Sequence, residues 1–128
     1  MTKLEYNLNK VDEMYKFKKN WNLYGAEPIP KGTLNLTKKV LKELTMQPEV
    51  FPTGAGTIQL EYEKGNNYLE IELYKNNLNV FLIDENREES FSIKAKYRFK
   101  KIDSIVDYIN FLIEEYVNGW CEYEKETN

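Results

Sequence analysis

The sequence predicts a single α+β domain, in which an antiparallel meander of four or five strands carries a C-terminal helix on one face and two N-terminal helices complete the fold. Two patterns predict it. Residues 56–99 place apolar side chains at every second position, with glycine- and asparagine-containing turns between the runs. Residues 102–117 repeat apolar side chains at helical spacing instead. The alternating residues are Ile58, Leu60, Tyr62, Leu69, Ile71, Leu73, Leu78, Val80, Leu82, Phe91, Ile93, Ala95 and Tyr97.

Three turns set the expected register of the meander. They lie at residues 65–66 (Gly-Asn), 76–77 (Asn-Asn) and 85–88, and glycine and asparagine tolerate the positive φ that tight hairpins need. Each turn keeps the apolar residues on one face, whereas a slip of one residue would turn a strand inside out. The expected cross-strand pairs are Leu60 with Ile71, Leu73 with Val80, and Leu82 with Phe91.

Two helices are predicted ahead of the meander. The first is a short helix over residues 10–19 with Asn9 as its N-cap, preceded by a loose tail over residues 1–8. The second runs over residues 31–46 and begins after Pro30, since proline suits the first turn of a helix.

The segment between these helices, residues 20–30, is rich in turn-forming residues and carries Trp21 and Tyr24. The favoured interpretation is structural: the two aromatic side chains plug one end of the core. The other interpretation is a ligand-contacting loop, because ordered loops often carry binding residues.

The remaining elements follow from local signals. Residues 50–52 are expected to form a short strand, and the Gly-Ala-Gly within residues 53–56 is expected to be a plain turn. A phosphate loop is disfavoured, because this segment leads into a strand and no helix N-terminus faces it. The last helix is expected to end at residues 118–119 (Asn-Gly), before a loose tail over residues 121–128.

Composition narrows the classes of function. A chain of 128 residues is long enough to bury one core, and its net charge of −3 gives no support for nucleic-acid binding. No apolar run approaches the length of a membrane span, so no membrane association is expected. The single Cys121 allows no internal disulfide and fits a reducing cytoplasm.

The chain contains no histidine, which removes the usual general base, the usual metal ligand and every Ser-His or Cys-His arrangement. One cysteine leaves no thiolate zinc site. The sequence therefore predicts a protein without enzymatic activity, cofactor or metal.

Two stretches of the sequence resemble a known family. Residues 21–30 read WNLYGAEPIP, and residues 50–73 read VFPTGAGTIQLEYEKGNNYLEIEL. Together they resemble a widespread family of small uncharacterised bacterial and phage proteins with a W-x-G-Y-x-A-x-P-I loop and a P-T-x-x-G-x-I-Q-L-E-W-E strand that leads into L-E-I-E-I. The sequence departs from the family at Leu23, where glycine is usual, and at Tyr62, where tryptophan is frequent. The resemblance implies a bacterial or phage origin and transfers no catalytic residue.

The predicted register also arranges the face of the sheet that points away from the core. It places Glu61 opposite Glu70, a like-charge pair, and puts Lys94 and Lys96 toward the far edge. The two expected rows are Gln59, Glu72, Phe81 and Ser92, and Glu61, Glu70, Ile83 and Ser90.

Three interpretations of this outer face are open. The first is a solvated face whose apolar residues are partly covered by the N-terminal helices. The second is a binding surface with Phe81 and Ile83 at its centre. The third is catalytic, with Glu61 and Glu70 as an acid pair or as ligands of a divalent cation.

We expect a cytosolic protein-binding module of bacterial or phage origin, most concretely a phage-encoded inhibitor of a host or defence protein. The alternatives are a carboxylate-based, metal-dependent enzyme and a self-associating structural protein that forms a homodimer. The residues expected to bind are Gln59, Glu61, Glu70, Glu72, Phe81, Ile83, Trp21 and Tyr24.

Overall fold

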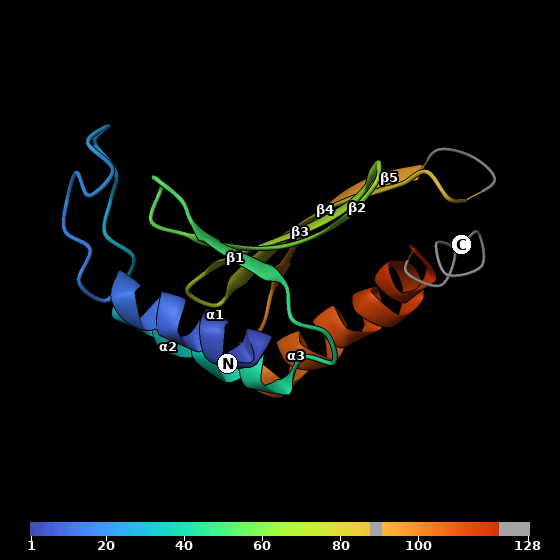
Figure 1. The fold of residues 1–128 in the computed structure, drawn as a ribbon, viewed down its shortest axis with the longest axis horizontal. Helices are drawn as coiled ribbons and strands as arrows, with labels where there is room; N and C mark the ends of the chain where they lie inside the picture. Colours follow the sequence, from blue (N-terminus) through green and yellow to red (C-terminus); the bar gives the residue numbers. More distant parts are fainter. Residues whose placement is uncertain (88–90, 121–128) are drawn as a thin grey trace.

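The computed structural model describes residues 1–87 and 91–120. A five-stranded antiparallel sheet has the strand order β1-β2-β3-β4-β5, and the helices lie against one face of it (Figure 1). This arrangement confirms the predicted α+β meander with a C-terminal helix. The elements are α1 (Lys3–Met14), α2 (Lys31–Glu43), β1 (Glu49–Pro52), β2 (Ile58–Lys64), β3 (Asn67–Tyr74), β4 (Asn77–Asp84), β5 (Phe91–Arg98), α3 (Ile102–Leu112) and the π-helical turn η1 (Ile113–Val117).

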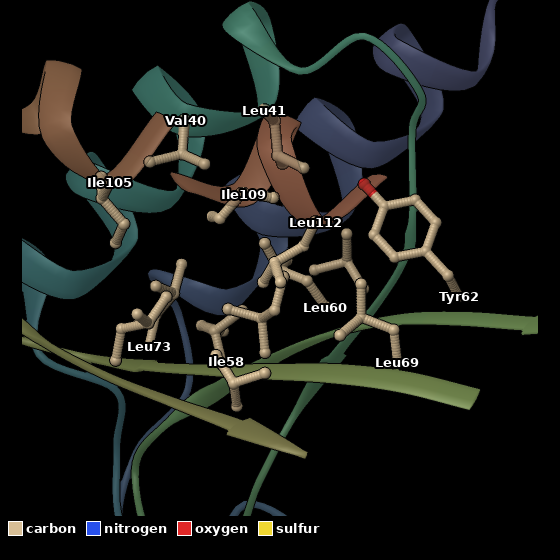
Figure 2. Close-up of a cluster of buried hydrophobic side chains, with 14 of the residues drawn as sticks. Val40, Leu41, Ile58, Leu60, Tyr62, Leu69, Leu73, Ile105, Ile109 and Leu112 are labelled. Atoms are coloured by element: carbon tan, nitrogen blue, oxygen red, sulfur yellow. The ribbon is translucent and has the colours of Figure 1, made fainter. Parts of the chain in front are cut away.

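The core lies between the sheet and the helices. Side chains from α2 and α3 point at the inward-facing residues of β2 and β3, which are all nearly inaccessible to solvent (Figure 2). Burying one such leucine or isoleucine stabilises the fold by about 1.5–3 kcal/mol. Tyr62 joins this layer because its hydroxyl donates to the carbonyl of Met46 at 2.6 Å. The labelled core residues are Val40, Leu41, Ile58, Leu60, Leu69, Leu73, Ile105, Ile109 and Leu112.

The register between β2 and β3 is as predicted. The registers between β3 and β4 and between β4 and β5 each differ from the prediction by two residues. Tyr74 pairs with Asn77, so the turn between β3 and β4 consists of Lys75 and Asn76. Lys75 takes a positive φ of 53°, and its N–H donates to the hydroxyl of Thr33 in α2 at 2.9 Å. A contact from the helix layer therefore accompanies a turn that starts one residue earlier. The observed pairs are Leu73 with Leu78 and Leu82 with Ile93, so the pairs Leu73–Val80 and Leu82–Phe91 were wrong.

The N-terminal helix was also placed wrongly. It runs over Lys3–Met14 instead of residues 10–19, so residues 1–8 are not a loose tail. Thr2 caps it: its hydroxyl accepts from the N–H of Glu5, and the Glu5 side chain accepts from the N–H of Thr2. Asn7 is buried, and its amide donates to the carbonyl of Pro48 at 3.0 Å.

The other helix ends differ from the expectation in opposite directions. α2 stops at Glu43, three residues before the predicted end. The last helix does not stop at Asn118 and Gly119, because η1 follows α3 and residues 118–120 are helical as well. This continuation buries Trp120, which is only 1% exposed. The free energy gained by burying a large aromatic side chain exceeds the roughly 1 kcal/mol that a glycine costs within a helix.

No helix within the described ranges is both long and apolar enough to cross a bilayer. Ser90 lies outside the described residues, and so does the tail predicted at residues 121–128, which includes Cys121.

Replacing Ile109 with alanine should lower the free energy of unfolding by about 2–5 kcal/mol, because Ile109 is fully buried between α3 and the sheet. Phe111 lies in the same helix but is 55% exposed, so Phe111→Ala should cost less than about 1 kcal/mol. Urea denaturation measures both values. Equal losses, or a loss near zero for Ile109→Ala, would contradict the packing of α3 on the core.

Candidate functional site

The candidate site is the open face of the sheet, which we define as the side chains of β2–β5 that point away from the helices. Alternation along each strand turns them outward while their neighbours enter the core. The three central rows are Glu61, Glu70, Phe81 and Lys94; Gln59, Glu72, Asn79 and Lys96; and Glu63, Tyr68, Ile83 and Ser92.

These rows correct two of the predicted neighbours. Phe81 lies beside Glu70, not beside Glu72, and Ile83 lies between Tyr68 and Ser92. The earlier turn between β3 and β4 moves every residue of β4 by two positions along β3, and a separate shift of two residues between β4 and β5 changes the neighbours in β5. The opposition of Glu61 and Glu70 is confirmed, because the turn between β2 and β3 was predicted correctly.

None of the described helices covers this face. α1 packs against α2 and β1, and α2 packs against β2, β3 and α3, so both N-terminal helices belong to the core side (Figure 1). The expectation that they partly cover Phe81 and Ile83 is wrong. Both side chains are nevertheless half-buried, because neighbouring side chains of the same face lie against them.

Aromatic contacts form the centre of the open face. The rings of Tyr68 and Phe81 have centroids 6.2 Å apart and are tilted by 58°. The ammonium of Lys94 lies 5.5 Å from the Phe81 centroid, which is a cation–π distance. The centre therefore joins an acidic side on β2 and β3 to a basic side on β5.

The open face is also hollowed. A depression of about 500 Å³ crosses β3, β4 and β5, and a smaller one of about 200 Å³ adjoins it toward the β1–β2 turn. Both share Asn79 and Lys96. The larger is lined by Glu70, Asn79, Val80, Phe81, Lys94, Ala95 and Lys96.

The two opposed carboxylates share one hydroxyl. Tyr68 Oη lies 2.6 Å from Glu61 Oε1 and 2.8 Å from Glu70 Oε1, and its single hydrogen donates to one of them at a time. Burial raises the pKa of Tyr68 above its usual value, and the hydrogen bonds to the two carboxylates raise it further. The hydroxyl therefore keeps its proton at neutral pH and offsets part of the like-charge repulsion.

Glu72 is held differently from the other two glutamates. Its Oε2 accepts from the hydroxyl of Thr57 at 2.9 Å, and its Oε1 accepts from the amide of Asn79 at 2.8 Å. Gln59 lies between Phe51 and Glu72 in the same row. The Glu72 side chain is therefore held in place by hydrogen bonds within the protein itself.

The structure separates Trp21 and Tyr24 from the open face. Trp21 stacks on Phe17 with centroids 4.6 Å apart, and its indole N–H donates to the carbonyl of Glu27 at 2.7 Å. Tyr24 is 91% exposed, so the expectation that it plugs the core is wrong. Their loop extends beyond one end of the sheet (Figure 1).

Leu23, in the same loop, was not among the predicted site residues. It is 82% exposed and has a positive φ of 69°. Glycine would adopt this backbone conformation without steric cost, whereas leucine rarely does. Tyr68 was missed as well, although its place two residues before Glu70 puts it on the outer face.

The central rows of the open face offer carboxylates, a tyrosine hydroxyl, amides and ammonium groups. Among the described residues, no group of three or more carboxylate or cysteine side chains could hold a metal ion. Glu61, Tyr68 and Glu70 are linked by hydrogen bonds and lie on adjacent strands of the open face. Comparisons with protein-family models, curated proteins and solved structures found no match.

Replacing Tyr68 with phenylalanine should lower the free energy of unfolding by about 1–2 kcal/mol at neutral pH, because Glu61 and Glu70 lose the donor between them. Tyr74→Phe is the matched control: Tyr74 lies on the same face of β3, and its hydroxyl has no partner within the described residues. Adding Glu61→Gln to Tyr68→Phe should raise the free energy of unfolding again, since it removes the repulsion between the two carboxylates. Equal urea midpoints for the two tyrosine variants would refute the shared hydrogen bond.

Proposed function

We propose that the protein is a non-enzymatic binding module that contacts another protein through the open face of its sheet. The observation that carries this proposal is the aromatic centre formed by Tyr68 and Phe81, which no described helix covers and which lies between an acidic and a basic side. An antiparallel sheet can expose one face to water, but such a face is normally polar. Aromatic residues with a polar rim are typical of the centres of protein interfaces.

The charges of the face favour an oriented partner. Glu61 and Glu70 lie on one side of Phe81, and Lys94 and Lys96 lie on the other. A partner with an apolar centre and the opposite order of charges would match it, and complementary charge sets orientation and association rate more than affinity.

The resemblance of residues 21–30 and 50–73 to bacterial and phage proteins supports a bacterial or phage origin. A cytoplasmic inhibitor of a host or defence protein is the most concrete form of the proposal. A second copy of the chain is the alternative partner, since a two-fold axis can bring the acidic side of one open face onto the basic side of another.

Phe81→Asp should abolish partner binding, because it places a charge at the apolar centre of the contact. Phe111→Asp is the matched control, since Phe111 is an exposed aromatic residue of α3, on the helix side of the molecule. Affinity capture from host cells should retain one protein with the wild type and with Phe111→Asp, and lose it with Phe81→Asp. The pair is then reconstituted from purified proteins.

Two results would contradict this proposal. One is a purified partner that binds Phe81→Asp as tightly as the wild type while both variants melt at similar temperatures. The other is a wild-type dimer, detected by sedimentation, that Phe81→Asp converts to monomer while nothing else is captured. That outcome would identify a second copy as the occupant of the open face.

The enzyme alternative, with Glu61 and Glu70 as metal ligands, has a separate test. Mg²⁺, Mn²⁺ and Ca²⁺ should leave the melting temperature unchanged, because a ligand raises it only by binding the folded state. Glu70→Gln is measured beside the wild type to separate a specific effect from an ionic-strength effect. A rise that disappears in Glu70→Gln would favour a metal site.

A further inference from the structure

The two edges of the sheet differ in how well they are protected. β1 has four residues, ends at Pro52, which lacks an N–H, and is flanked by α1. The ammonium of Lys10 also lies 4.6 Å from the ring centroid of Phe51. β5 has eight residues, and no strand follows it in the described sheet. A long free edge is a template for an added strand.

The register shows which backbone groups of β5 face outward. The N–H of Phe99 donates to the carbonyl of Asn76 at 3.0 Å, and these two residues continue the β4–β5 register as a hydrogen-bonded pair. Such pairs recur at every second residue of an antiparallel ladder. The residues that turn N–H and C=O toward the free edge are therefore Ser92, Lys94, Lys96 and Arg98. Within residues 1–87 and 91–120, none of these outward N–H and C=O groups has a hydrogen-bond partner.

The core side of β5 is incompletely covered. Ile93 is half-buried, whereas its neighbours in β3 and β4 are fully buried. Tyr97 is 44% exposed and lies 4.7 Å from Tyr108 of α3, measured between ring centroids. Beside them lies a hollow of about 170 Å³ with mainly apolar walls. Apolar side chains of an added strand would extend the core over this margin.

The open-face side of β5 is basic. Lys94, Lys96 and Arg98 project from consecutive outward positions, and none forms an ion pair within the described ranges. A second copy that added its own β5 in antiparallel register would place these cations opposite one another, which is destabilising. An acidic strand would instead pair a carboxylate with each cation.

We propose that β5 is a docking edge for an extended segment of another protein, whose side chains alternate between apolar and acidic, and which adds to the sheet as a further strand. The apolar side chains would cover Ile93 and Tyr97, and the acidic ones would lie beside Lys94 and Lys96. Main-chain hydrogen bonds supply affinity in this mode of recognition, and the alternation supplies specificity. The proposal does not require the open-face contact, and different variants test the two.

The probe is a fluorescent synthetic peptide in which leucine and isoleucine alternate with glutamate, and the matched peptide has lysine in place of glutamate. Anisotropy should show binding of the acidic peptide to the full chain, weakening with salt, and no binding of the basic peptide. Lys96→Pro removes an outward N–H and should weaken binding at least about tenfold, whereas Lys96→Ala, which removes only the charge, should weaken it about two- to fivefold.

A second variant keeps the backbone intact in case proline disturbs the strand. Lys94→Glu combined with Lys96→Glu should reverse the preference, so that the basic peptide binds and the acidic one does not. Equal binding of both peptides to the wild type, no binding of either, or an unchanged preference in the reversed variant would overturn the proposal. A wild-type dimer that Lys96→Pro dissociates would also overturn it, in favour of a second copy at β5.

Discussion

The alternation of apolar and polar side chains along β2, β3 and β4 is the constraint on which the rest of the structure depends. It buries one face of the sheet under α2 and α3 and leaves the other free of any described element. Because the inward residues are almost fully buried, a strand can shift along its neighbour only by an even number of residues. The position of the helices and the existence of the open face both follow from this rule.

The same rule explains which sequence predictions were correct. Moving a two-residue turn by one position shifts the register by two, so the inward and outward sets stay the same. Leu73 and Val80 were therefore assigned to the correct face although they do not pair. The error arose because local turn preferences favoured asparagine, whereas Lys75 takes the positive φ and bonds to Thr33 of a distant helix. The turn preferences of neighbouring residues carry no information about a contact with a residue so far away in the sequence.

The candidate site was predictable where it depends on the β2–β3 turn and not where it depends on the later registers. The opposition of Glu61 and Glu70 depends on one correctly placed turn, so it could be predicted; the neighbours of Phe81 depend on the shifted turn, so they could not. One other error had a legible signal. The Thr-x-x-Glu capping box at residues 2–5 marks the start of α1.

The two proposed surfaces are physically linked by Lys94 and Lys96. Their side chains form the basic side of the open face, and their backbone groups face the free edge of β5. An acidic strand docked at that edge would offset both cations and leave Glu61 and Glu70 as the dominant charges around Phe81. The partner proposed for the open face, whose acidic side would face Lys94 and Lys96, would then lose part of its electrostatic attraction and bind less tightly. By linkage, that partner would weaken the docking of the acidic strand by the same factor.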